Sequence, residues 1–388
     1  MKKRINRGGE KEKREWMHQV GTWVKIAIAV CLVATLFYFR NSLSLDGLQS
    51  WFSSLTGSST SVVASGGEQF KFVADSHNNY LYYRDQLAVV GPEGIKIFSS
   101  KEEYSLPLSY QKPVAKASKK YLISYEMGKK ELTVVYDHEI KHTITTDGSL
   151  ITAAVNDSGF ILTVTSETNY KGVITVYNSA FEQIYKYSGN ETIMDADISP
   201  SSDGFQMLSV STDKGYFSSK LTSFSLDKEE PVGTYEMDNV MAIDVSYQDS
   251  SVVNVLSDHD LYSFNTKAEQ KGDYNFGGRN LQFYDLSPDR YNVVVLSTNQ
   301  SGSKSSVKLL DSNGGEKGEY QVDEEVKDIA ADGANVYVLT QKKILVINSS
   351  GNLTKTLELK DEIRAITPSK DGIYAIAQNW AKDVAVAG

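Results

Sequence analysis

A strand ending in a turn recurs along most of this chain, and this repeat restricts the fold more than any other feature. Its copies are Ile95–Phe98, Leu132–Asp137, Val173–Asn178, Leu221–Leu226, Leu261–Asn265, Val307–Asp311, Ile344–Asn348 and a weaker copy at Val384–Ala387. The marker residues of successive copies lie 37 to 47 residues apart. No helix-length apolar period interrupts them after residue 70. The pattern therefore predicts an all-β repeat protein.

Each repeat contains other strand-like runs beside the marker. A run that closes on a small or acidic residue precedes it, as in Asp195–Pro200 and Phe283–Pro288. An apolar run such as Phe160–Thr165 lies between the two, and a fourth run such as Thr354–Leu359 follows the marker. Four strands in about 40 residues is typical of a β-propeller blade, which buries its two faces only by stacking against neighbours in a ring. The nearly constant spacing between the markers disfavours a solenoid or a tandem array of β-sandwich domains.

The two ends of the repeat region indicate how the ring closes. The last repeat has room for only three strands, at Ile363–Thr367, Gly372–Ala377 and Asp383–Ala387. Gln69–Ala74 is a strand-like run without a repeat of its own. If it joins the last blade, the ring closes without an open sheet edge. We predict one domain over residues 69–388 with eight four-stranded blades, or seven if Tyr80–Tyr83 or Val384–Ala387 is miscounted.

One apolar run, Val20–Arg40, precedes the repeats, and we predict that it is a single transmembrane helix. Its length reaches the roughly 20 residues of a membrane span if Lys25 extends its stem to the headgroups. Trp23 and Tyr38 then lie near the two interfaces. The run ends in bulky residues and Arg40, which disfavours a cleaved signal peptide. Its sole cysteine, Cys31, lies inside the run, which disfavours a lipidation signal.

Charge predicts the orientation of this helix. Residues 1–40 carry a net charge of +6 and the rest of the chain −15, from the positions of Lys, Arg, Asp and Glu. Positive flanks stay in the cytoplasm, so we expect a cytoplasmic basic tail at 1–19 and an extracytoplasmic domain in a single-pass bacterial membrane protein. The acidic domain argues against a nucleic-acid partner. Without cysteines it also has no disulfides, so its core must supply its stability.

Residues 41–68 are interpreted as a linker. Apolar residues from Leu45 to Leu55 recur at helical spacing, so the 43–55 segment is either a short helix in the membrane interface or an irregular linker. Thr56–Gly67 is rich in Ser and Gly and is expected to be flexible.

Four segments carry a resemblance to a known family: Tyr121–Gly128, Ala154–Gly159, Tyr170–Tyr177 and Asp195–Pro200. In these, and in its tail and span before the repeats, the chain resembles bacterial membrane-anchored, propeller-like proteins catalogued as a domain of unknown function. Glu126–Lys129 departs from the Asp and paired glycines expected there. The resemblance implies an envelope protein with a quinoprotein-like or WD-repeat-like propeller. It brings no activity and no catalytic residues.

The residues themselves offer few candidates for a site. Asp195, Asp197, Asp244 and Asp285 fall near equivalent ends of the first strand of their repeats, where they could line one mouth of the ring or satisfy backbone donors in turns. His138 and His142 lie near acidic residues, but a solvated turn explains them as well as a metal does. We therefore predict no catalytic, metal or cofactor site.

Two functions remain open. The first is a non-catalytic scaffold that binds an envelope protein or a cell-wall component, and it follows from the anchor and from the absence of a catalytic motif. The alternative is a propeller enzyme, either a quinone-dependent dehydrogenase or a glycan hydrolase. Only one tryptophan, Trp380, lies in the repeats, and this scarcity argues against a quinone cofactor.

Overall fold

The computed structural model describes residues 59–63, 69–99, 102–212, 215–286, 291–297 and 304–386. Residues 60–388 form a compact unit that is separate from residues 1–59. The predicted tail at 1–19, the predicted span at 20–40 with Trp23, Lys25, Tyr38 and Arg40, and the linker up to residue 58 lie outside the described residues. Within the described part, no helix is long and apolar enough to cross a membrane.

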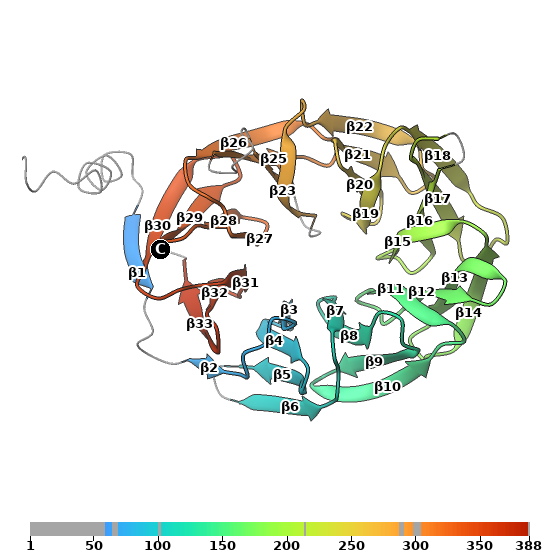
Figure 1. Ribbon diagram of the computed structural model, residues 1–388, viewed down its shortest axis with the longest axis horizontal. Coiled ribbons are helices and arrows are strands. Elements are labelled where there is room, and N and C mark those ends of the chain that lie inside the picture. The colour runs from blue at the N-terminus through green and yellow to red at the C-terminus, as the bar shows by residue number, and fades with distance from the viewer. Residues whose placement is uncertain are drawn as a thin grey trace, which may run out of the picture. The chain divides into compact units, whose positions relative to one another are not determined.

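Eight antiparallel sheets are arranged in a ring, with the first strand of each blade toward the centre (Figure 1). From the centre outward, blade one consists of β3 (Asn79–Tyr83), β4 (Gln86–Gly91), β5 (Gly94–Phe98) and β6 (Glu103–Pro107), and blade two of β7 (Pro113–Ala117), β8 (Tyr121–Glu126), β9 (Glu131–Tyr136) and β10 (Glu139–Thr145). Blade three consists of β11 (Ser149–Val155), β12 (Ile161–Glu167), β13 (Tyr170–Tyr177) and β14 (Gln183–Gly189), and blade four of β15 (Thr192–Ile198), β16 (Gly204–Ser211), β17 (Ser218–Ser225) and β18 (Gly233–Asp238).

Blades five to seven follow the same order. Blade five consists of β19 (Ala242–Tyr247), β20 (Val252–Ser257), β21 (Asp260–Asn265) and β22 (Gln270–Asn275). Blade six consists of β23 (Asn280–Asp285), β24 (Asn292–Ser297), β25 (Ser305–Leu310) and β26 (Glu316–Val322). Blade seven consists of β27 (Asp328–Ala331), β28 (Asn335–Leu339), β29 (Lys343–Asn348) and β30 (Leu353–Leu359). Blade eight is β31 (Ala365–Pro368), β32 (Gly372–Ile376), β33 (Trp380–Ala385) and β2 (Phe70–Lys71). The predicted eight-bladed β-propeller is confirmed.

The burial of the strands explains the apolar runs of the sequence. The second and third strands of a blade are buried almost throughout, as in β24 and β25, because neighbouring blades cover both of their faces. The fourth strands alternate between exposed and half-buried residues, as in β14, because one face meets solvent. Apolar clusters join successive blades: Leu208 and Leu221 of blade four pack with Val245 and Val253 of blade five. The core of the ring is thus a series of interfaces between blades.

The ring closes through β2, as the sequence predicts, although the paired segment is only two residues long. Phe70 pairs with Ala381 and Lys71 with Trp380 of β33. The Phe70 ring lies 5.4 Å from that of Phe98 in blade one and 6.0 Å from that of Tyr374 in blade eight. The N-terminal strand therefore joins the first and last blades by both backbone pairing and side-chain packing.

The structure differs from the prediction for the linker at one segment. β1 (Ser59–Val63) lies within the run expected to be flexible, yet it adds a fifth strand to the outer edge of blade seven, beside β30. Val63 is only 3% exposed and joins the apolar cluster that contains Leu357 and Ile363. Its carbonyl accepts a hydrogen bond of 3.0 Å from the Lys360 amide. Burial of this valine against a preformed edge outweighs the polar, glycine-rich composition around it.

Candidate functional site in the central channel

Five polar side chains from five successive blades form a connected group along the inner strands. We call this group the channel arc, and it consists of Lys116 on β7, Thr152 on β11, Asp195 on β15, Asp244 on β19 and Tyr284 on β23. Lys116 Nζ lies 3.3 Å from Thr152 Oγ1 and 3.5 Å from Asp195 Oδ1. The Thr152 hydroxyl also lies 3.3 Å from Asp195 Oδ1. Each contact crosses from one blade to another.

Irregularities of the inner strands align these side chains. The pairing register of β11, β15 and β19 shifts just before Thr152, Asp195 and Asp244, respectively. Such a β-bulge inserts one residue and turns the following side chains relative to the rest of the strand. Because the shift occurs at the same level in three successive blades, the three polar residues come into line.

Asp244 has the most unusual environment of the arc. Burial raises the pKa of its carboxyl above the ordinary value, and the neighbouring Asp195 carboxylate raises it further. Hydrogen bonds join the Asp244 side chain to Asp195 and to Tyr284. Two carboxyls held this close cannot both ionise easily, and the pKa of Asp244 is raised to about 7. The Asp195 side chain is 13% exposed and lies within ion-pair distance of Lys116.

Lys116 remains charged in this setting. Burial lowers the pKa of its ammonium group, but Asp195, Asp197 and Asp244 together outweigh burial and the pKa lies above the ordinary value. The side chain is 41% exposed, so solvent screens part of this attraction. The arc therefore joins one ammonium group to two neighbouring carboxyl groups.

A second set of carboxylates binds backbone instead of side chains. Asp197 accepts hydrogen bonds from the Ile198 amide at 2.9 Å and from the Tyr247 amide of the next blade at 2.8 Å. Asp285 accepts from the Ala331 amide of the next blade at 3.0 Å. Asp195 also accepts from the Val245 amide, at 3.3 Å. These bonds hold each inner strand to its successor, which is the backbone role that the sequence left open.

Asp328 has the same role although the sequence did not single it out. Its carboxylate accepts from the Ile329 amide at 2.9 Å and from the Ile366 amide of blade eight at 2.8 Å. Burial raises the pKa of Asp328 to about 6, and burial likewise raises the pKa of Asp197 to about 6. Asp328 begins its inner strand β27, whereas Asp285 ends the inner strand β23 one blade earlier, so a search for acidic residues at one end of each repeat does not find Asp328.

The structure thus brings Asp195, Asp197 and Asp244 of blades four and five together and places Asp285 on blade six, where it bonds to blade seven. Sequence reasoning missed Lys116, Thr152 and Tyr284. The only local hint was a single lysine in the apolar strand Pro113–Ala117. Among the described residues, no three metal-binding side chains come together. The arc links blades two to six through side chains.

The two histidines near the acidic turn serve different neighbours. His138 Nε2 lies 2.7 Å from Gln86 Oε1, and the ring stacks on Tyr104 of blade one at 4.0 Å. The His142 ring stacks on Phe181 of blade three at 4.6 Å. Because the two rings contact opposite neighbours, they do not form a common metal site.

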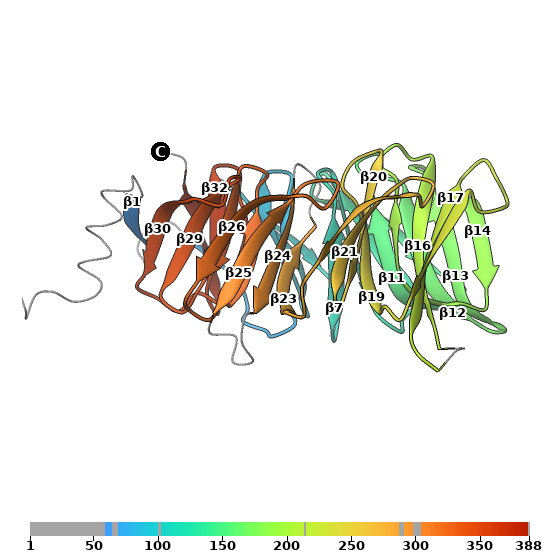
Figure 2. The same ribbon diagram turned by 90° about the horizontal axis from the view of Figure 1, so that it is seen from above.

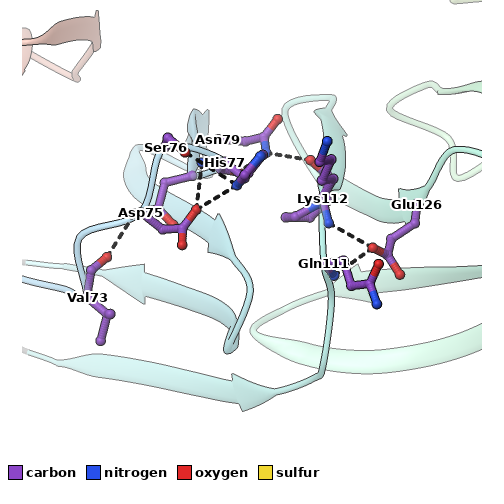
Figure 3. A network of polar contacts seen from close by, with 10 residues as sticks. Val73, Asp75, Ser76, His77, Asn79, Gln111, Lys112 and Glu126 are labelled. Atoms are coloured by element: carbon purple, nitrogen blue, oxygen red, sulfur yellow. Dashed lines mark hydrogen bonds and ion pairs between the residues drawn. The ribbon is translucent and has the colours of Figure 1, made fainter.

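The divergent turn at Glu126 has a structural explanation (Figure 3). Glu126 Oε1 accepts hydrogen bonds from the backbone amides of Gln111 and Lys112, at 2.6 and 2.8 Å. Beside it, the Asn79 side-chain amide donates to the Pro113 carbonyl at 2.9 Å, which joins blade one to blade two. Glu126 therefore holds the link between these blades in place.

The chain matches the model of one protein family and is similar to solved structures. The sequence model of a family described as "Family of unknown function (DUF5711)" matches residues 64–384. No curated protein matches the sequence. The crystal structure of BamB from Moraxella catarrhalis is similar at 10% identity and a TM-score of 0.39, covering 68% of this chain and 94% of that one. A chain of the crystal structure of the Mitotic Checkpoint Complex is similar at 11% identity and a TM-score of 0.47, covering 84% and 93%. At this identity neither likeness carries functional information.

Proposed function

The chain belongs to this family of unknown function, and we propose that the protein is a membrane-anchored, extracytoplasmic β-propeller that acts as a non-catalytic interaction scaffold. One observation carries the proposal. Among the described residues, large apolar side chains are exposed in the turns at one end of the ring only.

This end carries the turns between the second and third strands of each blade and the links between blades. Its exposed side chains are Val73 (54%), Met127 (64%), Tyr170 (44%), Tyr216 (39%) and Phe217 (50%). We call it the apolar end. The other large apolar side chains that are exposed in the described part of the chain lie on outer strands, Ile140 and Ile184, or on inner strands, Ile243 and Tyr284. An uneven apolar surface of this kind is typical of a binding surface.

The state of the carboxylates supports a non-catalytic role. Asp197, Asp285 and Asp328 accept backbone hydrogen bonds from the next blade. Both oxygens of Asp195 are likewise engaged, by Lys116 and Thr152 on one side and the Val245 amide on the other. A general base needs a carboxylate oxygen that can reach substrate, and these oxygens are bound to the protein itself.

The proposed location rests on sequence. The run at 20–40 has the length and interfacial aromatics of one span, and the basic residues of 1–19 favour a cytoplasmic N-terminus. The proposed contacts are the lipid bilayer through this helix and, through the apolar end, a component of the cell envelope. A reporter enzyme active only outside the membrane, fused after residue 388, should be active. The same reporter fused before residue 20 should be inactive, and the reverse pattern would refute the location.

Site-specific photo-crosslinking in cells tests the role of the apolar end. In the full chain, a photoreactive amino acid at Tyr170 should give a defined adduct. The same amino acid at Lys120, in the β7–β8 turn at the opposite end, should give none. Adding Phe217→Ser should weaken the adduct at position 170. No adduct with either protein or lipid at position 170, or equal adducts at both positions, would refute the proposed scaffold.

A further inference from the structure

We propose that the apolar end docks on the surface of a lipid bilayer, with the turns of blades two, three and four entering the headgroup layer. This inference rests on the proposed function and names the component that the apolar end contacts.

The exposed side chains form a row on three neighbouring blades. Met127 lies in the β8–β9 turn, Tyr170 begins β13 after the β12–β13 turn, and Tyr216 and Phe217 lie in the β16–β17 turn. These turns occupy the same position in successive blades, so the side chains project from the same end of the ring. In Figure 2 the β16–β17 hairpin reaches beyond the neighbouring turns. The row therefore consists of separate projecting tips.

The backbone presents these tips without further ordering. Left-handed conformations close the three turns, at Gly128 (φ 80°), Asn169 (φ 75°) and Gly215 (φ 82°). Glycine and asparagine adopt this conformation at little cost. A preformed turn loses little conformational entropy on binding. Methionine, tyrosine and phenylalanine also suit a membrane interface, where an apolar or amphipathic side chain enters the boundary between headgroups and acyl chains.

Charge favours an anionic surface at these turns. Lys129 and Lys171 adjoin Met127 and Tyr170 and are exposed, and neither forms an ion pair with a described residue. The acidic neighbours are engaged, because Asp147 and Glu167 both pair with Lys186, at 3.1 and 3.3 Å. A lysine near an anionic bilayer contributes roughly a fivefold gain in binding.

The opposite end of the ring differs in its exposed apolar side chains. Its turns expose acidic residues such as Asp157, Asp249 and Asp371, and no large apolar side chain is exposed in those of its turns that the structure describes. Acidic residues are exposed at the apolar end as well, such as Glu131, Asp238 and Glu325. The attraction to anionic headgroups is therefore local to Lys129 and Lys171, and the exposed apolar side chains orient the ring. A fluid bilayer also accepts separate projecting tips at any spacing, whereas a protein partner needs a complementary surface.

A single fluorescent label tests the inference, because Cys31 is the sole cysteine. The full chain carrying Cys31→Ala and Tyr170→Cys is labelled with an environment-sensitive dye and reconstituted in phosphatidylcholine vesicles containing phosphatidylglycerol. We expect a blue shift of the emission, quenching by nitroxide-labelled lipid, and protection from aqueous iodide. The matched control, Cys31→Ala with Lys120→Cys, places the dye at the opposite end. There, iodide should quench and the nitroxide lipid should not.

Two further variants separate the contribution of the apolar side chains to lipid binding from that of the lysines. Met127→Ser with Phe217→Ser should abolish the quenching by lipid at position 170. Lys129→Glu with Lys171→Glu should weaken it in vesicles with phosphatidylglycerol and leave it unchanged in pure phosphatidylcholine. Far-ultraviolet circular dichroism and resistance to trypsin verify that each variant folds.

The outcomes distinguish the two proposals. Equal exposure of both labels to iodide in anionic vesicles would overturn docking on lipid. A protein adduct at position 170 in cells, together with that equal exposure, would leave the scaffold standing with a protein as its partner. Absence of both the lipid quenching and any adduct would refute both proposals.

Discussion

At the scale of single residues, the inner-strand carboxylates act mainly by joining blades. Asp197 is the clearest case, since it accepts an amide from its own strand and one from Tyr247 of the next blade. An amide that loses its acceptor in this inner wall is costly, because water does not replace the acceptor fully. These aspartates therefore contribute to stability although they resemble site residues in the sequence.

Removing one carboxylate should show this directly. We expect Asp197→Ala to lower the free energy of unfolding by about 2 to 4 kcal/mol, because the Tyr247 amide loses its acceptor. Asp197→Asn keeps one acceptor oxygen and should cost less. The exposed Asp371→Ala is the control and should change stability by less than about 0.5 kcal/mol. Urea unfolding at neutral pH measures all three. An Asp197→Ala as stable as the control would contradict the assigned role.

The raised pKa values also predict a dependence on pH. The pKa of Asp328 is about 6 in the fold, above the value near 4 of an unfolded chain. The folded state therefore holds the proton more tightly, and the stability that this provides is complete below pH 4 and is lost as the pH rises through 6. Each such group, Asp197 included, lowers the free energy of unfolding by up to about 3 kcal/mol over this window.

Asp328→Asn isolates this contribution, since an amide does not titrate in this range. The difference in unfolding free energy between wild type and variant should move in favour of the variant as the pH rises from about 4 to about 7. Urea unfolding across that range tests the sign. A difference that stays constant would show that the carboxyl titrates at its ordinary pKa in the fold.

At the scale of elements, two N-terminal strands have separate roles. β2 completes blade eight and closes the ring, whereas β1 adds a fifth strand to a blade that already has four. β1 contributes one well-buried apolar side chain, Val63, and one backbone hydrogen bond to Lys360. Its loss should therefore be a local event.

Val63→Asp should release β1, because an unpaired carboxylate is costly in the cluster with Leu357 and Ile363. Hydrogen exchange should increase over Leu353–Lys360 and stay unchanged in β31 to β33. Ser61→Ala, a substitution in the same strand that adds no charge, is the control and should leave the exchange of Leu353–Lys360 unchanged. Increased exchange throughout the ring would mean that β1 is needed for closure.

At the scale of the whole molecule, stability depends on a closed series of interfaces between blades. The chain itself joins blade eight to blade one through β2 and β3, so the ring is closed inside blade eight, where β2 and β33 come from opposite ends of the propeller sequence and are held by pairing and side-chain packing alone. This closure depends on the two-residue β2 and on Phe70, which packs against Phe98 and Tyr374. It is where we expect the ring to open first.

Phe70→Ala tests this expectation, with Tyr187→Ala as the matched control. Tyr187 packs on Phe224 at 5.0 Å across the interface between blades three and four, which the chain joins directly. Both changes remove a half-buried ring, so both should cost about 2 to 4 kcal/mol at most. Only Phe70→Ala should also raise hydrogen exchange in β31 to β33. Similar exchange in the two variants would show that the closure at β2 opens no more readily than an interface between consecutive blades.

Much of the architecture was predictable from sequence because it depends on local patterns. Strand propensity, turn residues and the repeat length specify small sheets of four strands, and the incomplete last repeat specifies a closing strand. All seven full marker runs lie in third strands, β5 to β29. The count of eight blades and the donated strand at Phe70–Lys71 follow from that pattern.

What the tertiary structure decided depends on contacts between residues far apart in the sequence, as over 38 positions from Asp328 to Ile366 or 50 from Asp197 to Tyr247. Bulges align the polar side chains of neighbouring inner strands, so Lys116 meets Asp195, and Asp195 raises the pKa of Asp244. Packing on a preformed edge orders Val63 within a polar run. The stacking of blades places Met127, Tyr170 and Phe217 at one end. Local sequence does not encode these contacts between blades, because each contact forms only when both blades have folded and stacked.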